Sequence, residues 1–133
     1  MTVLVAYDGS DDADKAIERA IVSRNEGESV IVLFVIPKAM IKALETMPSE
    51  ESHQRAQEFV NAAVRKLSQR GVTSIGVVRE GNVAGEILDF AKELDCSMIV
   101  IGSKGAGKVG RFTIGSVADK VMRHADRPVL VVR

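Results

Sequence analysis

The stretch of sequence best suited to chemistry is a basic, glycine-rich loop that runs from Gly102 to Ser116. It carries five glycines, three cationic residues and no acidic residue. Apolar residues then recur at helical spacing from Ile114 onwards. A glycine loop that leads into a helix offers free backbone N–H groups and the positive end of a helix dipole. We therefore interpret the loop as the phosphate-binding part of a nucleotide site.

Two short phosphate-binding motifs almost fit this loop. The pattern Gly102-x4-Gly107-Lys108 resembles a P-loop, but Val109 stands where a magnesium-binding Ser or Thr belongs. The pattern Gly105-x-Gly107-x-x-Gly110 spells the dinucleotide fingerprint, but residues 111–114 separate it from the helix that it should open. Both matches are therefore weak, because short glycine patterns arise easily by chance.

The elements that must position the loop alternate between strand and helix. Apolar runs at 2–7, 29–36 and 96–101 predict strands buried on both faces, 72–79 predicts a strand near a sheet edge, and 129–132 predicts a short last strand. Five alternations indicate a parallel sheet with helices on both faces. Ligands bind such sheets where the strand order reverses. We expect that point between the first strand, which leads to Asp8, and the fourth, which leads to Gly102.

Helix boundaries and faces also follow from the pattern. Ser10 and Asn82 are predicted N-caps, and Gly71 is a predicted C-cap. Apolar stripes predict that Phe59, in a helix from about 50 to 70, and Met122, in the last helix, pack on the sheet.

Length and composition exclude several classes of protein. The 133 residues, 46% of them hydrophobic and 27% charged, predict one domain over residues 1–133. A formal net charge of zero argues against a nucleic-acid partner, and no apolar run approaches the roughly 20 residues of a membrane span. The single cysteine, Cys96, and the absence of a signal-peptide pattern indicate a cytoplasmic protein.

A longer pattern in the loop, Gly102-x2-Gly105-x9-Gly115-Ser116, resembles the nucleotide-binding signature of the universal stress protein family. The resemblance covers essentially the whole chain, including the turn at 79–81 and the closing strand at 128–132. It implies an α/β fold of the adenine nucleotide alpha hydrolase-like type. In that fold an open five-stranded parallel sheet has the order 3-2-1-4-5, with helices on both faces. It also implies membership of the family's ATP-binding branch and, usually, a homodimer.

The resemblance assigns roles to particular residues. It implies that Asp8 contacts the nucleoside, that the backbone of Val35 reads the adenine edge, and that Gly115 and Ser116 meet the phosphates. The full set of implied ligand residues is Ala6, Asp8, Val35, Ile101, Gly102, Gly105, Gly115, Ser116 and Val117. Asp8 has an alternative role as a turn residue.

The physical chemistry of the glycines agrees with these roles. We expect Gly102 and Gly105 to permit positive φ and a close approach of the ligand. We also expect Gly115→Val to abolish binding and leave the fold intact.

The function expected from these residues is that of an ATP-dependent binding module with slow or no hydrolysis. No catalytic residue and no metal ligand is assigned, although Mg²⁺ or Mn²⁺ could accompany ATP by bridging its phosphates. Two alternatives stay open: an enzyme of adenylate chemistry, and an interaction protein with an unused site.

Two further segments carry expectations. The apolar last strand, Val129–Val132, is predicted to lie at a sheet edge and to pair with a second copy in a homodimer. The segment Met40–Met47 has two interpretations, a short helix on the sheet edge or a mobile flap over the nucleotide.

Overall fold

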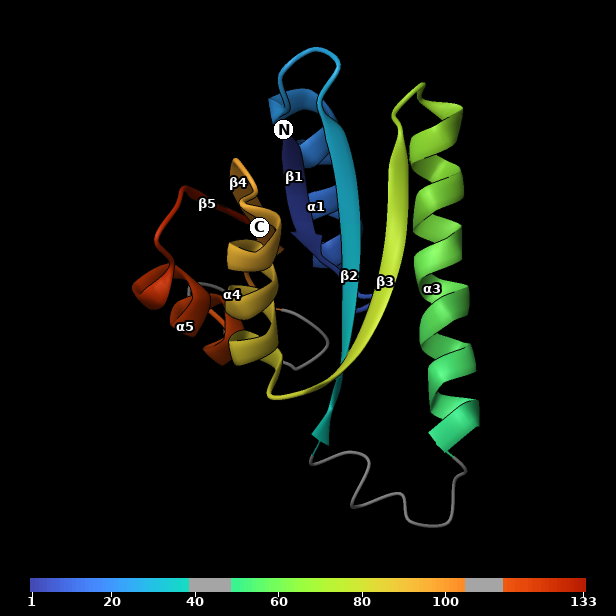
Figure 1. Ribbon diagram of the computed structural model, residues 1–133, viewed down its shortest axis with the longest axis vertical. Helices are drawn as coiled ribbons and strands as arrows, with labels where there is room; N and C mark the ends of the chain where they lie inside the picture. Colours follow the sequence, from blue (N-terminus) through green and yellow to red (C-terminus); the bar gives the residue numbers. More distant parts are fainter. Residues whose placement is uncertain (39–48, 105–113) are drawn as a thin grey trace.

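The computed structural model describes residues 1–38, 49–104 and 114–133, and the predictions for Met40–Met47, Gly105, Lys108 and Arg111 lie outside these ranges. Strands and helices alternate along the chain, as the sequence predicts (Figure 1). The elements are β1 (Thr2–Ala6), α1 (Asp11–Ser23), β2 (Ser29–Pro37), α3 (Ser49–Gln69), β3 (Ser74–Gly81), α4 (Val83–Leu94), β4 (Met98–Gly102), α5 (Ser116–His124) and β5 (Val129–Val132).

The five strands form one parallel sheet in the order β3-β2-β1-β4-β5. This is the order that the family resemblance implies, and it confirms that β1 and β4 are neighbours. Ala6 pairs with Leu33 of β2 on one side and with Ile101 of β4 on the other. The chain winds outward from β1 in both directions, so the strand order reverses between β1 and β4.

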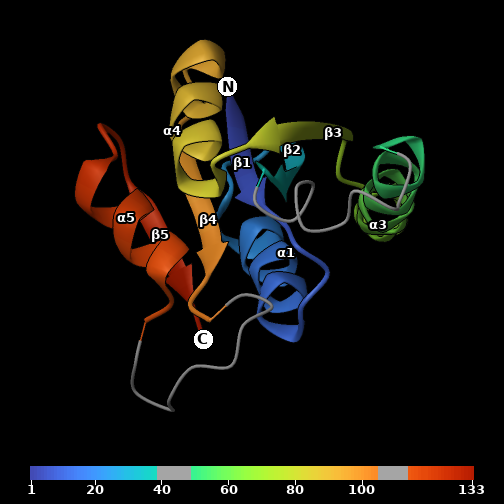
Figure 2. The ribbon, with the colours of Figure 1, turned by 90° about the horizontal axis from the view of Figure 1, so that it is seen from below.

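Helices cover both faces of the sheet, as Figure 2 shows from below. The buried side chains of α1 and α3 form one apolar core with one face of the strands, and those of α4 and α5 form a second core with the other face. β1 contributes to both cores, since Val3 and Val5 point to the first and Leu4 and Ala6 to the second. Burial on both faces explains why the strands read as unbroken apolar runs.

The helix caps predicted from the sequence are present in the structure. The hydroxyl of Ser10 accepts a hydrogen bond from the backbone N–H of Ala13 at 3.1 Å, and the side chain of Asn82 accepts one from Gly85 at 2.9 Å. Gly71, with φ of 73°, takes the left-handed conformation expected after α3. These local contacts confirm the starts of α1 and α4, the two helices that follow β1 and β3.

Three local predictions are wrong in detail. β4 begins at Met98 rather than Cys96. The backbone N–H of Ser97, just before the strand, donates to the carbonyl of Thr2 in β1. Phe59 is 46% exposed and Met122 is 43% exposed, so neither is part of the buried core. Phe59 stacks on Phe34 of β2 at a ring-centroid distance of 5.9 Å. It lies at the margin of the apolar face that α3 packs against the sheet.

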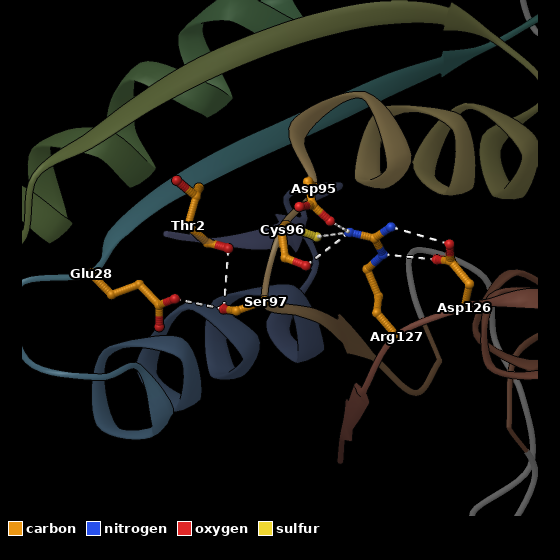
Figure 3. Close-up of polar contacts among 7 residues, drawn as sticks. All are labelled: Thr2, Glu28, Asp95, Cys96, Ser97, Asp126 and Arg127. Atoms are coloured by element: carbon orange, nitrogen blue, oxygen red, sulfur yellow. Dashed lines mark hydrogen bonds and ion pairs between the residues drawn. The ribbon is translucent and has the colours of Figure 1, made fainter.

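Two clusters of polar side chains lie at the amino-terminal ends of the strands (Figure 3). The Ser97 hydroxyl donates to the Glu28 carboxylate at 2.6 Å. The guanidinium of Arg127, only 11% exposed, donates to the carbonyl of Cys96 and pairs with Asp126. Cys96 is a buried free cysteine, and its burial raises the pKa of the thiol.

Replacement of Glu28 by glutamine should make stability less dependent on pH. The hydrogen bond from Ser97, together with that from the Asn25 amide, lowers the pKa of the Glu28 carboxyl despite its burial. A depressed pKa contributes stability above the pKa of the unfolded state, and this contribution is lost as the pH falls through the folded-state value. We expect Glu28→Gln to cost about 1–2 kcal/mol at pH 7.

Urea unfolding at pH 7 and near pH 3.5 measures this difference. Glu26→Gln is the matched control, because Glu26 is exposed on the same turn. The loss in Glu28→Gln should shrink at the lower pH. An equal loss at both pH values would show that the ionised carboxylate contributes nothing.

Candidate functional site

A cavity of about 140 Å³ lies where the strand order reverses, outside the carboxyl ends of β1 and β4. Strands β1, β2 and β4 form its floor, and the first turns of α4 and α5 form its sides. Its lining comprises Ala6, Tyr7, Asp8, Leu33, Val35, Val83, Ile87, Ile101, Gly102, Ser103, Lys104, Gly115, Ser116, Val117 and Ala118.

The structure brings together almost all of the site residues predicted from the sequence. Eight of the nine line this one cavity: Ala6, Asp8, Val35, Ile101, Gly102, Gly115, Ser116 and Val117. The ninth, Gly105, lies outside the described residues. Lys104 also lines the cavity, so at least one cation of the basic loop faces the space.

The walls divide into an apolar and a polar part. Leu33, Val35, Ile87 and Ile101 are buried side chains that form an apolar wall. Polar groups come from the turn that follows β1, from the loop that follows β4 and from the start of α5. An apolar slot with a few polar groups at one side suits a flat aromatic ring that carries a polar or charged substituent.

The start of α5 supplies the most definite polar feature. The backbone N–H of Gly115 donates to the carbonyl of Ser103 at 2.5 Å, which fixes the N-cap against the exit of β4. Gly115 has no side chain to cap the helix, and among the described residues no side chain accepts a capping hydrogen bond from the amides of the first turn. Uncapped first-turn amides and the positive end of a helix dipole favour an anion. Phosphate or carboxylate oxygens fit this position.

Gly102 is a glycine for a reason that differs from the predicted positive φ, because its φ is not positive. Gly115, where close approach of the backbone is expected, does not have a positive φ either. A Cβ at Gly102 would lie 2.9 Å from backbone and side-chain carbons of Asp12, and one at Gly115 would lie 2.9 Å from the carbonyl oxygen of Ser103. Both glycines therefore allow close approach of the protein's own backbone. On these distances the start of α5 must shift in Gly115→Val, so we expect that variant to lose stability as well as binding.

Asp8 lies in the turn after β1 and reaches the cavity. Its carboxylate accepts a hydrogen bond from the backbone N–H of Ser10 at 3.0 Å, which gives it the turn role that the sequence left open. It also lines the cavity. Next to it, Gly9 has φ of 80° and lies under the ring of Phe59, where a Cβ would be 2.8 Å from a ring carbon. The aromatic ring thus helps to fix the turn that carries Asp8.

Sequence reasoning missed Asp12, which joins α1 to the exit of β4. Its carboxylate accepts hydrogen bonds from the hydroxyl of Ser103 at 3.1 Å and from the backbone N–H of Lys104 at 3.2 Å. Ser103 is only 2% exposed, so its hydroxyl has little access to water. Asp12 therefore sets the position of the first residues of the basic loop. No local signal distinguishes Asp12 from the other acids of the first turn of α1.

Replacement of Asp12 by alanine should lower the free energy of unfolding by about 1–3 kcal/mol, because two donors at the exit of β4 lose their acceptor. Urea denaturation measures the loss. Asp11→Ala is the matched control, since Asp11 is an exposed acid of the same turn and shares its interaction with the helix dipole. Equal losses in the two variants would show that the dipole, rather than the contact to Ser103, accounts for the effect.

Tyr7 and three apolar residues are further cavity residues that the sequence did not single out. Tyr7 donates its hydroxyl to Asp14 at 2.5 Å, and burial together with this hydrogen bond raises its pKa. It therefore stays a neutral donor at ordinary pH. Leu33 and Ile87 are part of apolar patterns that predict core, and only the arrangement of β2 and α4 places them, together with Val83, at a cavity.

Comparison with known proteins places the chain in a family. The sequence model of the Universal stress protein family matches residues 1–133. The chain belongs to the universal stress protein family. Among characterised sequences of the family, it is similar to the universal stress protein YxiE of Bacillus subtilis (strain 168). The two are 29% identical over 144 residues, which cover 98% of this chain and 97% of YxiE.

Solved structures of similar proteins share the fold. The structure of the hypothetical protein MJ0577 superposes with a TM-score of 0.90 at 25% identity, covering 98% of this chain and 94% of that one. A universal stress protein from Archaeoglobus fulgidus, solved in complex with dAMP, superposes with a TM-score of 0.77 at 28% identity, covering 100% and 98%. These comparisons confirm the family and the fold that the residues of the loop and the strand ends indicate.

Two kinds of feature are absent from the described residues of this family member. Within residues 1–38, 49–104 and 114–133, no three His, Cys, Asp or Glu side chains gather in a way that could hold a metal ion. In the same ranges, no helix has the length and apolar character needed to cross a bilayer.

Proposed function

We propose that this universal stress protein binds an adenine nucleotide in the cavity between the exits of β1 and β4. The observation that carries the proposal is the meeting of an apolar slot with the uncapped start of α5 in one small space. The slot suits the base, and the helix start suits a phosphate. The complex of the Archaeoglobus fulgidus relative with dAMP supports an adenine nucleotide as the ligand class.

The finer part of the proposal is that the nucleotide is ATP and that the protein acts as a binding or regulatory module. The base lies against Ala6, Val35 and Ile101, and the Asp8 carboxylate contacts the nucleoside. The backbone N–H groups of Ser116 and Val117 bind phosphate, together with Gly102 and Gly105 of the basic loop. Residues 1–133 act as one domain in this proposal.

Isothermal titration calorimetry with ATP, ADP and AMP tests the proposal. We expect saturable binding of at least one of the three with one site per chain. Analysis of the nucleotide that co-purifies with the protein from cells identifies the ligand independently. Absence of binding at millimolar nucleotide with magnesium would contradict the proposal and favour an interaction protein with an unused site.

We propose slow or no turnover of ATP, because Asp8 is the one acid that lines the cavity among the described residues and it is already bonded to Ser10. Magnesium or manganese would then be bound through the phosphates of the nucleotide rather than through a protein cage. Product analysis separates the alternatives. Rapid release of AMP and pyrophosphate would instead identify an enzyme of adenylate chemistry.

We also propose a homodimer formed through β5. This strand is at one edge of the sheet, and Val129, Leu130 and Val131 are each only partly buried. Antiparallel pairing of two copies would cover the unpaired edge. Chemical cross-linking and light scattering at micromolar concentration test this arrangement, and a purely monomeric protein would contradict it.

A cytoplasmic location is the last part of the proposal. The only cysteine of the sequence, Cys96, is a buried free thiol, which is compatible with a reducing compartment. Fractionation of cells that carry a tagged protein tests this location.

A further inference from the structure

Phe59 of α3 lies behind the turn that carries Asp8. Its ring packs against Gly9, since a Cβ at this glycine would lie 2.8 Å and 2.9 Å from two carbons of the ring. The same ring stacks on Phe34 of β2, with 5.9 Å between the centroids and 16° between the ring planes. Phe59 therefore joins α3 to the turn after β1 and to β2.

The stack with Phe34 brings Phe59 to the back of the cavity wall. Phe34 and Val35 are consecutive in β2, so their side chains point to opposite faces of the sheet. Phe34 packs on the core that α1 and α3 cover, whereas Val35 lines the cavity. The ring of Phe59 thus supports two parts of the wall, the turn that carries Asp8 and the strand that carries Val35, from the face of the sheet opposite to the cavity.

Gly9 is the residue of this turn with the greatest conformational freedom. Its φ is 80°, and glycine adopts positive and negative φ about equally readily. Hydrogen bonds fix its neighbours: the N–H of Tyr7 donates to the carbonyl of Leu33 at 2.8 Å, and the N–H of Ser10 donates to the carboxylate of Asp8 at 3.0 Å. Neither bond involves Gly9. A ring packed on the glycine excludes conformations that would carry the carboxylate away from the cavity.

We propose that Phe59 is a positioning residue for the nucleoside end of the site. Its ring holds the turn at residues 8–10 in the conformation that presents the Asp8 carboxylate to the ligand, and it acts on binding through Asp8 rather than by touching the ligand. The inference rests on the proposed nucleotide function and on the contact assigned there to Asp8. A carboxylate that is already in place loses less conformational entropy when the ligand binds, so removal of the ring should lower affinity.

A double-mutant cycle of Phe59→Ala and Asp8→Ala, read by calorimetric titration of ATP, tests this coupling. In the wild-type background we expect Phe59→Ala to weaken ATP binding by roughly three- to tenfold. In the Asp8→Ala background the same change should weaken binding by less than about twofold, because the group that the ring positions is gone. Phe59→Leu, which keeps an apolar side chain without the flat ring, takes the place of Phe59→Ala if alanine unfolds the protein.

Two more variants separate positioning from a general loss of stability. Phe59→Tyr keeps an aromatic ring against Gly9 and should bind ATP within about twofold of the wild type. Val64→Ala is the matched control, because Val64 is a half-buried residue of the same helix that packs on the same core but lies near Gly76 of β3 rather than near Gly9. It should lower the urea midpoint and leave ATP affinity unchanged.

The outcomes distinguish this inference from the proposed function. A wild-type protein that binds no ATP would overturn both. Wild-type affinity in Phe59→Ala, or in Asp8→Ala, would overturn the positioning role and leave nucleotide binding in place. Equal losses from Phe59→Ala in both backgrounds would also overturn it, because the ring would then act independently of Asp8. A loss of affinity in Val64→Ala as large as that in Phe59→Ala would assign the effect to the packing of α3 as a whole.

Discussion

Ala6→Phe is expected to weaken nucleotide binding by about a hundredfold or more, because the ring takes the place of the base. Ala6 is the last residue of β1, is 8% exposed, and lines the cavity between Leu33 and Ile101. The space measures about 140 Å³, and a cavity of about 150 Å³ accommodates a benzene ring. The new side chain therefore fills existing space, and the fold should be retained.

Calorimetric titration of ATP measures the loss of affinity, and thermal unfolding of the same samples tests whether the fold is retained. Ala6→Ser is the matched control, since it changes the polarity of the position with little change in volume, and it should bind within a few-fold of the wild type. A folded Ala6→Phe protein that still binds with wild-type affinity would place the ligand elsewhere.

Gly115→Ala is expected to lower both stability and nucleotide affinity. A Cβ at this position would lie 2.9 Å from the carbonyl oxygen of Ser103 and 3.1 Å from that of Lys104, so the start of α5 must move away from the exit of β4. Overpacking against backbone costs roughly 1–3 kcal/mol. The same movement displaces the first-turn amides that we assign to the phosphate, so affinity should fall by about tenfold or more.

Urea unfolding and ATP titration of Gly115→Ala measure these losses. Gly85→Ala is a suitable control, because it also adds one methyl group near a helix start. There the nearest atom is the side-chain oxygen of Asn82 at 3.2 Å rather than a carbonyl of the main chain. Alanine also has a higher helix propensity than the glycine that it replaces at position 85. If Gly115→Ala were as stable as the wild type, the close contact between α5 and β4 would not constrain the site.

The sequence predicts most of the fold because the signals involved are local. Unbroken apolar runs mark strands buried on both faces, and Ser10 and Asn82 cap their helices through contacts three residues away. The meeting of Asp8 and Gly102 at one crevice follows from topology rules for parallel sheets. The strand order itself came from the family resemblance, because alternation alone does not fix which strands are neighbours.

The errors and omissions concern contacts between distant parts of the chain. Asp12 and Ser103 are 91 residues apart in sequence, and nothing near Asp12 indicates that it bonds to the exit of β4. The sequence predicts positive φ and close approach of a ligand at Gly102, whereas its lack of a side chain admits the start of α1. Phe59 has the spacing of a core residue but lies at the margin of the α3 stripe, against Phe34 and Gly9.

A crystal structure of the protein with bound ATP shows where the nucleotide binds. We expect the base against Ala6, Val35 and Ile101, and a phosphate on the amides of Ser116 and Val117. A ligand at another surface, or a cavity closed by the protein's own side chains at saturating ATP, would contradict the proposed site.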